Sequence, residues 1–265
     1  MTMIQDRLVV VRGAGDLATG VILRLVHSGF RVVALEVAAP SAIRRTVSLS
    51  EAVYDGTACV EGLRAFRCEG PPPPGTHLDP VPVVVDPEGR LLAHLRPAAV
   101  VDAILAKRNL GTRLDMAPVV VGLGPGFTAG VDVHAVVETQ RGHDLGRVIL
   151  EGAAQPNSGV PGLIGGHGAD RVLRAPAAGP VETHAAIGDT LKAGDRVCSV
   201  GGRAVTAPFD GVLRGLIRPG FQAWEGLKVA DVDPRGNPAH CHTVSDKARA
   251  IGGGVLEALL RLGSG

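Results

Sequence analysis

The sequence predicts an α/β protein in which a parallel sheet is followed by a small all-β module and a C-terminal helix. Three observations support this prediction. Strand-like and helix-like runs alternate up to about residue 150, glycine and proline crowd residues 152–168, and short strand-turn units follow from residue 171. We therefore expect a ligand-binding α/β domain over 1–150, a Gly/Pro-rich linker over 151–170, an all-β module over 171–235 and a helical segment over 236–265.

The first half begins with a strand-helix-strand pattern. Residues 8–12 and 31–37 are apolar strands, and between them Leu17 to Ser28 carry apolar side chains at helical spacing before Gly29 ends the helix. Such βαβ units build parallel sheets. The pattern further predicts a short helix over 50–56 capped by Ser50, a strand over 81–86, a helix from Pro97 to Arg108 and a strand over 117–122.

The second half contains an internal echo. The run APAAGPV begins at Ala175 and APFDGVL begins at Ala207, and a turn-strand-turn pattern lies between them. Two similar units of this length predict a small sandwich with pseudo-twofold symmetry. A final helix, capped by Ser245, should run to about Leu262. Its triple glycine at 252–254 lowers helix propensity, which indicates close packing against another backbone.

Composition excludes several classes of function. The 27 basic and 26 acidic residues give a net charge of +1, and only 3% of residues are aromatic, so a nucleic-acid-binding surface is not expected. No apolar run is long enough to span a membrane. The first strand starts at Leu8 and the four cysteines are widely spaced without a CxxC pair. We therefore expect reduced thiols, no signal peptide and a cytoplasmic protein.

The first glycine-rich turn, RGAGDLATG, matches the fingerprint of a Rossmann-like dinucleotide site. Gly13 permits the tight turn and Gly15 permits the close approach of a phosphate. The small side chain of Ala18 allows the helix to pack closely on the strand. Glu36 stands at the distance expected for a carboxylate that binds ribose hydroxyls. Asp16 departs from the pattern, because a carboxylate at a helix N-terminus occupies the positive pole that a phosphate uses. Asp16 therefore either caps its own helix or faces a hydroxyl, amine or metal-bound phosphate of a ligand.

A second strand enters a second glycine-rich turn, GLGPGFTAG. If this turn faces the first, Gly124, Gly126 and Thr128 offer backbone donors and a hydroxyl to a shared ligand. In the following run, Asp132, His134 and Glu138 share one face of a strand, and the last two also align on a helix. These three residues are candidates for acid–base chemistry, or they form the solvated face of an edge element.

Two further groups suggest ligands less specifically. Arg44 and Arg45 follow the second strand, where they either clamp an anion or lie on the surface. The run HCH at 240–242 suggests a metal, but adjacent residues point apart and no second cluster exists, so no metal site is predicted.

The stretches RGAGDLATGV, AIRRTVSLSEAVYDG, GLGPGFTAGVDVHAVVETQRGHDLGRVI, QPNSGVPGLIGG and SDKARAIGGGVLEALL together resemble the YqeB-type accessory proteins of selenium-dependent molybdenum hydroxylase systems. The N-terminal half also resembles the Rossmann domain of XdhC-type factors, which handle molybdenum cofactor, but it has Asp16 and lacks an obvious sulfur-handling cysteine pair. The C-terminal half is similar to the biotinyl/lipoyl barrel-sandwich, with IGDTLKAGDRV and APFDGVLRG as its two turns.

The resemblance implies a maturation factor for a client molybdenum hydroxylase. Its ligand would be nucleotide-like, either an NAD-like dinucleotide or a pterin-dinucleotide molybdenum cofactor, bound between the two glycine loops. The alternatives are an NAD-dependent oxidoreductase, with His134 as proton donor, and a non-catalytic scaffold that docks a client enzyme. The sequence is also compatible with a homo-oligomer. Because the hairpin tip SVGGRAV carries Arg203 and no lysine, neither biotin nor lipoate is expected.

Overall fold

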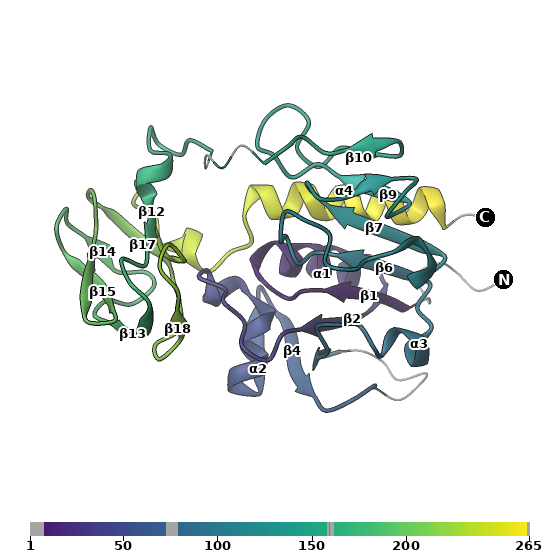
Figure 1. Ribbon diagram of the computed structural model, residues 1–265, viewed down its shortest axis with the longest axis horizontal. Helices are drawn as coiled ribbons and strands as arrows, with labels where there is room; N and C mark the ends of the chain where they lie inside the picture. Colours follow the sequence, from purple (N-terminus) through teal and green to yellow (C-terminus); the bar gives the residue numbers. More distant parts are fainter. Residues whose placement is uncertain (1–7, 73–78, 158, 160–161, 264–265) are drawn as a thin grey trace. The chain divides into compact units, whose positions relative to one another are not determined.

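The computed structural model describes residues 8–72, 79–157, 159 and 162–263, shown as a ribbon in Figure 1. The chain divides into two compact units. Unit 1 comprises Met1–Pro40, Ser48–Asn157 and Val244–Gly265, and unit 2 comprises Ser41–Val47 and Ser158–Thr243. The prediction placed four segments one after another along the chain. In the structure, unit 2 instead takes in a short early segment, and the final helix belongs to unit 1.

The described part of unit 1 contains a nine-stranded sheet of order β10-β9-β7-β6-β1-β2-β5-β4-β3. Its neighbours are parallel except for the outer pairs β3–β4 and β9–β10. The strands are β1 (Leu8–Arg12), β2 (Arg31–Glu36), β3 (Thr57–Val60), β4 (Leu63–Cys68), β5 (Val81–Val85), β6 (Ala99–Asp102), β7 (Val119–Leu123), β9 (Ala135–Val137) and β10 (Val148–Ile149).

The order of the strands reverses at the centre of this sheet. From β1 the chain adds β2 and β5 on one side, and it then returns to add β6, β7 and β9 on the other. In open α/β sheets, ligands bind outside the carboxyl ends of the strands at such a switch point. The switch point here lies between β1 and β6. A separate two-stranded sheet pairs β8 (Thr128–Ala129) with β11 (Gly152–Ala153).

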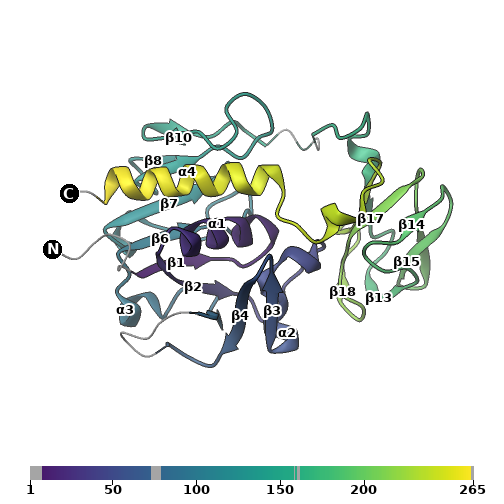
Figure 2. The same ribbon diagram turned by 180° about the vertical axis from the view of Figure 1, so that it is seen from behind.

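Helices α1 (Asp16–His27) and α4 (Asp246–Leu262) lie side by side in unit 1 (Figures 1 and 2). A Cβ at Gly20 would lie 2.6 Å from that of Ala248, and a Cβ at Gly252 would lie 2.9 Å from the carbonyl oxygen of Gly20. The same Cβ at Gly252 would lie 3.1 Å from that of Arg24, so the contacts advance from Gly20 to Arg24 on α1 as they advance from Ala248 to Gly252 on α4. The two helices are therefore parallel. The expected close packing of the triple glycine is confirmed at Gly252, and the predicted cap is confirmed because Ser245 Oγ accepts the N–H of Ala248.

Two local predictions are wrong. The segment Pro97–Arg108 is not a helix: its apolar part is strand β6, buried on both faces between β1 and β7. A strand buried on both faces has no polar alternation, so its sequence does not differ from that of a buried helix. Ser50 caps no helix; it lies in a 3-10 turn, Leu49–Glu51, that leads into α2 (Ala52–Asp55). The remaining helix is α3 (Leu92–Leu95).

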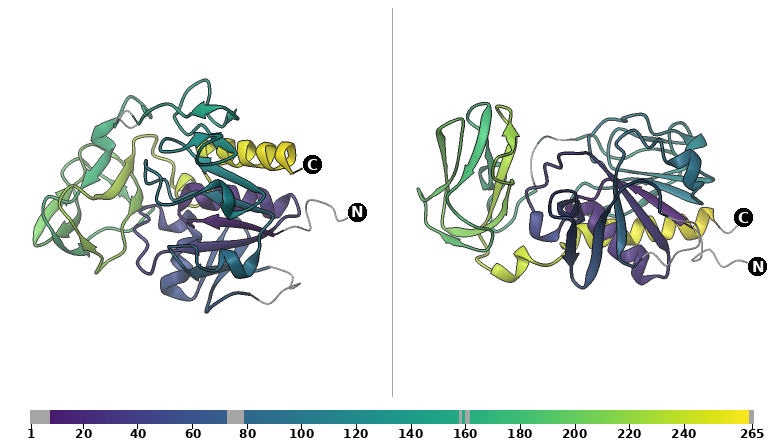
Figure 3. Two further views of the ribbon diagram at one scale, coloured as in Figure 1. Left: turned by 45° about the vertical axis from the view of Figure 1, so that its right-hand side comes forward. Right: turned by 90° about the horizontal axis from the view of Figure 1, so that it is seen from below.

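Unit 2 is all-β apart from three 3-10 turns in its described part, Arg45–Val47, Ala169–Arg171 and Pro238–Cys241. It contains two four-stranded sheets, β12-β19-β17-β14 and β16-β15-β13-β18, drawn in green in Figure 3. Its strands are β12 (Val172–Arg174), β13 (Gly179–Thr183), β14 (Thr190–Leu191), β15 (Arg196–Val200), β16 (Arg203–Thr206), β17 (Gly211–Leu216), β18 (Gln222–Ala223) and β19 (Lys228–Asp233).

The sequence echo appears in this unit as repeated structure. Strands β13, β14 and β15 begin 32 residues before β17, β18 and β19, and β12 begins 31 residues before β16. Exchanging the two halves converts the strand order of one sheet into that of the other. Apolar side chains from both sheets form one core, which includes Val197, Leu213 and Val232. No helix in the described part of the chain is long and apolar enough to cross a membrane.

Candidate functional site

The first glycine loop lies at the switch point, directly after β1. Gly13 has a φ of +101°, and a Cβ there would lie 2.9 Å from the carbonyl oxygen of Ala103 in the loop after β6. Gly15 differs, because its φ is −67° and a Cβ would meet no atom within 4 Å. Ala18 is buried in the first turn of α1. Gly13 is therefore required by the fold, whereas Gly15 leaves open space at the start of α1.

Glu36 lies at the end of β2 and binds the first glycine loop itself. Its Oε2 accepts the N–H of Ala14 and its Oε1 accepts that of Val37, both at 2.8 Å. Burial raises the pKa of Glu36, and the two hydrogen bonds partly oppose this. One backbone donor expected for a phosphate is therefore already used by a carboxylate.

Asp16 is the first residue of α1, and Gly15 occupies the cap position. The Oδ1 atom of Asp16 accepts the N–H of Leu17 at 2.8 Å. Its charge also acts on the amine of Lys247, at the start of α4. The expectation that Asp16 caps α1 is therefore wrong, because Gly15 holds the cap position and the carboxylate contacts the next residue's N–H and the charge of a protein amine. Its contact with a ligand stays a prediction.

The two glycine loops do not face each other directly, because β6 separates β1 from β7. The loop after β6 fills the space between them. Its Ala103 abuts Gly13, and its Arg108 backbone lies 2.6 Å from where a Cβ of Gly126 would stand. Gly124 is similarly required, because its φ is +74° and the side chain of Thr139 occupies the position of a Cβ. The second glycine loop therefore packs against neighbouring loops.

Two backbone donors of the second loop, the N–H groups of Gly124 and Thr128, are engaged within the protein. The N–H of Gly124 donates to the carbonyl oxygen of Val137 at 2.9 Å. Thr128 opens β8, and its N–H donates to Oδ2 of Asp132 at 2.9 Å. The structure therefore assigns these donors to the loop's own architecture.

A buried network holds the loop after β6. Arg12, at the end of β1, places Nη1 3.4 Å from Oδ2 of Asp102 at the end of β6, and it also donates to the Thr112 hydroxyl. That hydroxyl donates to the same carboxylate, whose other oxygen accepts the N–H of Ile104 at 3.1 Å. Arg12, Asp102 and Thr112 are each at most 2% exposed. The network fixes both ends of a loop in which Leu105 and Lys107 adopt left-handed backbone conformations.

The polar strand does not form a single catalytic group. His134 immediately precedes β9, and its Nδ1 accepts the N–H of Val120 at 3.0 Å, while Asp132 lies in the preceding turn. Glu138 follows β9 at the opposite end, and four residues of strand span about 13 Å. Glu138 is 2% exposed and accepts the N–H groups of Gln140 and Gln155, so the solvated-face interpretation is also wrong for it.

The sequence analysis missed Lys247, whose side chain is half-buried at the start of α4. Burial is the largest cause that lowers the pKa of this amine; Arg141 and Lys107 lower it further, while Asp16 and Glu138 oppose the change. A partly buried amine with a perturbed pKa is a candidate functional group. The available signal was its residue type, because the chain contains only four lysines among its 27 basic residues.

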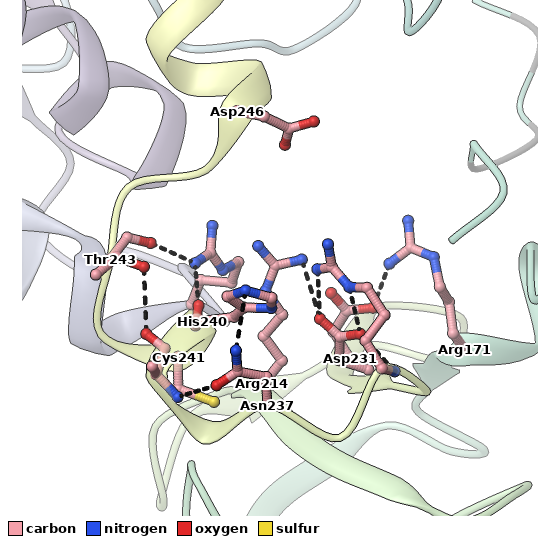
Figure 4. A network of polar contacts seen from close by, with 12 residues as sticks. Arg171, Arg214, Asp231, Asn237, His240, Cys241, Thr243 and Asp246 are labelled. Carbon is pink, nitrogen blue, oxygen red and sulfur yellow. Dashed lines mark hydrogen bonds and ion pairs between the residues drawn. The ribbon is translucent and has the colours of Figure 1, made fainter. Parts of the chain in front are cut away.

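Arg44 and Arg45 do not clamp an anion at the first glycine loop. Arg44 is 7% exposed, and its Nη2 donates to the carbonyl oxygens of His240 and Thr243, both at 3.1 Å. Arg45 donates from Nε to the carbonyl oxygen of Leu216 at 2.8 Å. Both arginines therefore attach the segment Ser41–Val47 to the rest of unit 2, the region drawn in Figure 4.

The same close-up shows ion pairs along β17 and β19 (Figure 4). Arg171 contacts Asp231 at 2.6 Å, and Asp233 contacts Arg235 at 2.6 Å and Arg214 at 3.6 Å. Burial lowers the pKa of Arg214. These arginine and aspartate side chains therefore partly neutralise one another within unit 2.

The thiol of Cys241 is buried in unit 2 and donates to the carbonyl oxygen of Leu213 at 3.6 Å. Burial raises the pKa of this thiol, which disfavours the thiolate that binds metals. Across the described ranges, no three His, Cys, Asp or Glu side chains are grouped so as to hold a metal ion.

No family model matches the chain. The chain is 54% identical over 258 residues to "Uncharacterized protein YqeB" of Escherichia coli (strain K12), and the match covers 97% of this chain and 48% of that protein. The chain therefore spans about half the length of this curated relative, whose name states no activity.

Two solved structures show weak likeness. An aspartoacylase family protein from Mesorhizobium loti is 13% identical with a TM-score of 0.28, and the ectoine utilization protein EutE from Ruegeria pomeroyi is 13% identical with a TM-score of 0.25. Each match covers 85% of this chain and 84% of the other. Scores this low carry no argument about fold or function.

Proposed function

We propose that unit 1 binds a nucleotide-like ligand, of the dinucleotide or pterin-dinucleotide class, and that the protein is an accessory factor for the maturation of a molybdenum hydroxylase. The observation that carries the binding proposal is Gly15. It stands at the switch point of the sheet with an ordinary backbone conformation and open space above it, where a phosphate meets a helix N-terminus. The resemblance to YqeB-type accessory proteins, including the selenium-dependent systems, supports the maturation role.

The described residues supply a specific set of groups for such a ligand. No hydrogen-bond acceptor in the described part of the chain takes the N–H of Gly15, so this donor remains for a phosphate oxygen. Glu36 closes the far side of the loop with a carboxylate that accepts the N–H of Ala14 and has capacity to accept a ribose hydroxyl as well. Lys247 adds a cationic amine near the start of α1.

We further propose that unit 2 is a biotinyl/lipoyl-like barrel-sandwich that presents a protein surface and carries no prosthetic group. Its two sheets with a 32-residue repeat support this assignment. The hairpin between β15 and β16 turns at Gly201 and Gly202. In the carrier modules a lysine at this hairpin tip receives the prosthetic group, whereas this chain has Arg203 there. A guanidinium stays protonated and does not form the amide that holds biotin or lipoate.

Ligand binding is tested by thermal shift and calorimetry with NAD, mononucleotides and pterin dinucleotides. Gly15→Val should leave the free energy of unfolding within about 1 kcal/mol of the parent, since the site is open and the backbone is unstrained. It should abolish the ligand-induced rise in Tm, whereas the matched control Gly253→Ala, also in open space, should keep it. No rise in Tm of the parent with any of these ligands at millimolar concentration would refute binding.

The maturation role is tested in a strain that lacks the protein. The client hydroxylase would be purified, and its molybdenum, selenium and pterin contents would be measured together with its activity. An intact polypeptide that lacks one of these components is the expected result and identifies the step. Full content with normal activity would reject the maturation role and favour a docking scaffold or an independent NAD-dependent enzyme.

A further inference from the structure

Strand β17 of unit 2 contains a buried arginine whose hydrogen-bond donors are not satisfied by the described part of the chain. The register between β17 and β19 shifts between Leu213 and Gly215, so Arg214 is the extra residue of a β-bulge, a feature that re-aims a side chain. The side chain of Arg214 is 8% exposed, yet its Nε has no hydrogen-bond partner among the described residues. A buried guanidinium in this position calls for an acceptor.

The carboxylate that pairs with Arg214 is held more closely by another arginine. Oδ2 of Asp233 lies 3.6 Å from Nη1 of Arg214, which is beyond hydrogen-bond distance. Arg235 contacts both oxygens of Asp233, at 2.9 Å from its Nε and 2.6 Å from its Nη2. Asp231, the other buried carboxylate of β19, contacts Arg171 at 2.6 Å (Figure 4). Three arginines therefore share these two carboxylates, and Arg214 has the longest contact.

A second buried donor comes from the turn Pro238–Cys241. Oδ1 of Asn237 accepts the N–H of Ala239 at 3.0 Å, so its Nδ2 is the atom that faces Nε2 of His240, 3.3 Å away, and donates to it. The proton of the neutral His240 ring is therefore on Nδ1. This nitrogen is buried, and within the described ranges it has no hydrogen-bond partner.

Contacts on both sides of Arg214 hold this turn against β17. A Cβ at Gly215 would lie 3.3 Å from Cγ of Arg44, and Nη2 of Arg44 donates to the carbonyl oxygen of His240 at 3.1 Å. The thiol of Cys241 donates to the carbonyl oxygen of the residue before Arg214 at 3.6 Å. The two buried donors therefore belong to segments that pack together, with the charge of Arg44 beside them.

We propose that unit 2 binds a tetrahedral oxyanion, of the phosphoryl class, through the guanidinium of Arg214 and the Nδ1–H of His240. A guanidinium offers its donors in one plane and the imidazole adds a donor from a separate segment, which suits an anion whose oxygens do not lie in one plane. Two negative charges would offset the repulsion of Arg214 by Arg44 and Arg235. The side chain of Arg235 is 41% exposed, so solvent reaches the ion pair beside the site.

This site belongs to unit 2 and is independent of the ligand proposed for unit 1. The test is calorimetric titration of the whole protein in phosphate-free buffer, in a Gly15→Val background that removes the phosphate position proposed for unit 1. Inorganic phosphate should bind with one ion per chain, and the planar anion acetate should bind at least about tenfold more weakly, because it cannot meet both donors. Methyl phosphate distinguishes the sources: equal affinity indicates the phosphoryl group of a larger ligand, and weaker binding indicates the free ion.

Variants in the same background identify the residues. Arg214→Met and His240→Phe should each weaken phosphate binding at least about tenfold, because each removes a hydrogen bond to a charged ligand. The matched control Arg196→Met, which removes an exposed arginine of β15, should bind phosphate as the background protein does. Arg214→Lys keeps the charge without the fork of donors, so it should fold and still bind phosphate more weakly. In phosphate-free buffer the Tm of Arg214→Met, followed by Trp224 fluorescence, should not fall below that of the background protein.

No binding of phosphate at millimolar concentration would overturn the inference, and so would equal affinity in Arg214→Lys, His240→Phe and the background protein. A lowered Tm of Arg214→Met with unchanged phosphate affinity would assign Arg214 to the structure of unit 2 instead. If the parent binds nucleotides and the background protein binds no phosphate, only this inference fails. If phosphate binds through Arg214 and no nucleotide binds the parent, only the proposed function of unit 1 fails.

Discussion

The buried network of Arg12, Asp102 and Thr112 should be the most sensitive polar feature of unit 1. The Arg12 and Asp102 side chains are 3% and 2% exposed, and Nη1 lies 3.4 Å from Oδ2. Replacing Asp102 by Ala leaves a guanidinium buried without its carboxylate. Breaking a buried pair in this way typically costs about 3–5 kcal/mol. Thr112→Val should cost about 1–3 kcal/mol, because the hydroxyl contacts both charged groups and its loss leaves each short of a partner.

The assay is urea unfolding followed by two signals. All four α-helices of the described chain belong to unit 1, so circular dichroism at 222 nm reports mainly on that unit. The single tryptophan, Trp224, lies in unit 2, and its fluorescence reports on that unit. Asp102→Ala should lower the midpoint of the 222 nm transition. The control Asp115→Ala removes an exposed carboxylate that pairs with the exposed Arg113, which should cost at most about 1 kcal/mol.

A double-mutant cycle separates the ion pair from the packing around it. Arg12→Met and Asp102→Leu should each be strongly destabilising, but the double variant should be less so than the sum, because it leaves no unpaired charge. A coupling energy of about 2 kcal/mol or more is expected from the full burial of both groups. Additive effects, or a cost of Asp102→Ala no greater than that of Asp115→Ala, would refute the reasoning.

Two further predictions follow from the packing of α4 and from the hairpin of unit 2. Gly252→Ala should destabilise the protein by about 1–3 kcal/mol, because the added methyl group meets the backbone oxygen of Gly20. Gly253→Ala places its methyl group in open space and should stabilise the protein by up to about 1 kcal/mol. Thermal unfolding compares the two variants, and equal effects would contradict the close packing. Intact-mass spectrometry of the natively expressed protein should show the unmodified polypeptide, and a biotinyl or lipoyl addition would contradict the argument from Arg203.

Sequence patterns predicted those parts of the fold that depend on neighbouring residues. The strand-turn-helix around Gly13 and Gly15, the cap at Ser245 and the 32-residue echo are local, and the structure contains each of them. The strand β6 was missed for a physical reason. Its four residues are buried on both faces, so no polar alternation marks them, and the proline before them resembles the first residue of a helix.

The candidate site was predicted less well, because it depends on contacts between distant segments. Glycines that looked suited to a phosphate, such as Gly124 and Gly126, serve close approaches to Thr139 and Arg108. Arg44 looked like a neighbour of the first loop because it follows β2, yet its segment packs in unit 2. Such assignments depend on which surface each segment reaches, and residue spacing along the chain does not contain that information.

The position of β6 changes how the site should be understood. Because this strand lies between β1 and β7, any ligand above Gly15 has the loop after β6 as its neighbour on that side, and the second glycine loop lies beyond it. That loop is fixed by a buried ion pair at one end and by Asn109 at the other, where Oδ1 of Asn109 accepts the N–H groups of Gly111 and Thr112. A loop so firmly held, with an exposed lysine in a left-handed conformation, is suited to positioning a charge. A ligand above Gly15 should therefore depend on this loop for its position, and the second glycine loop should act by supporting the loop.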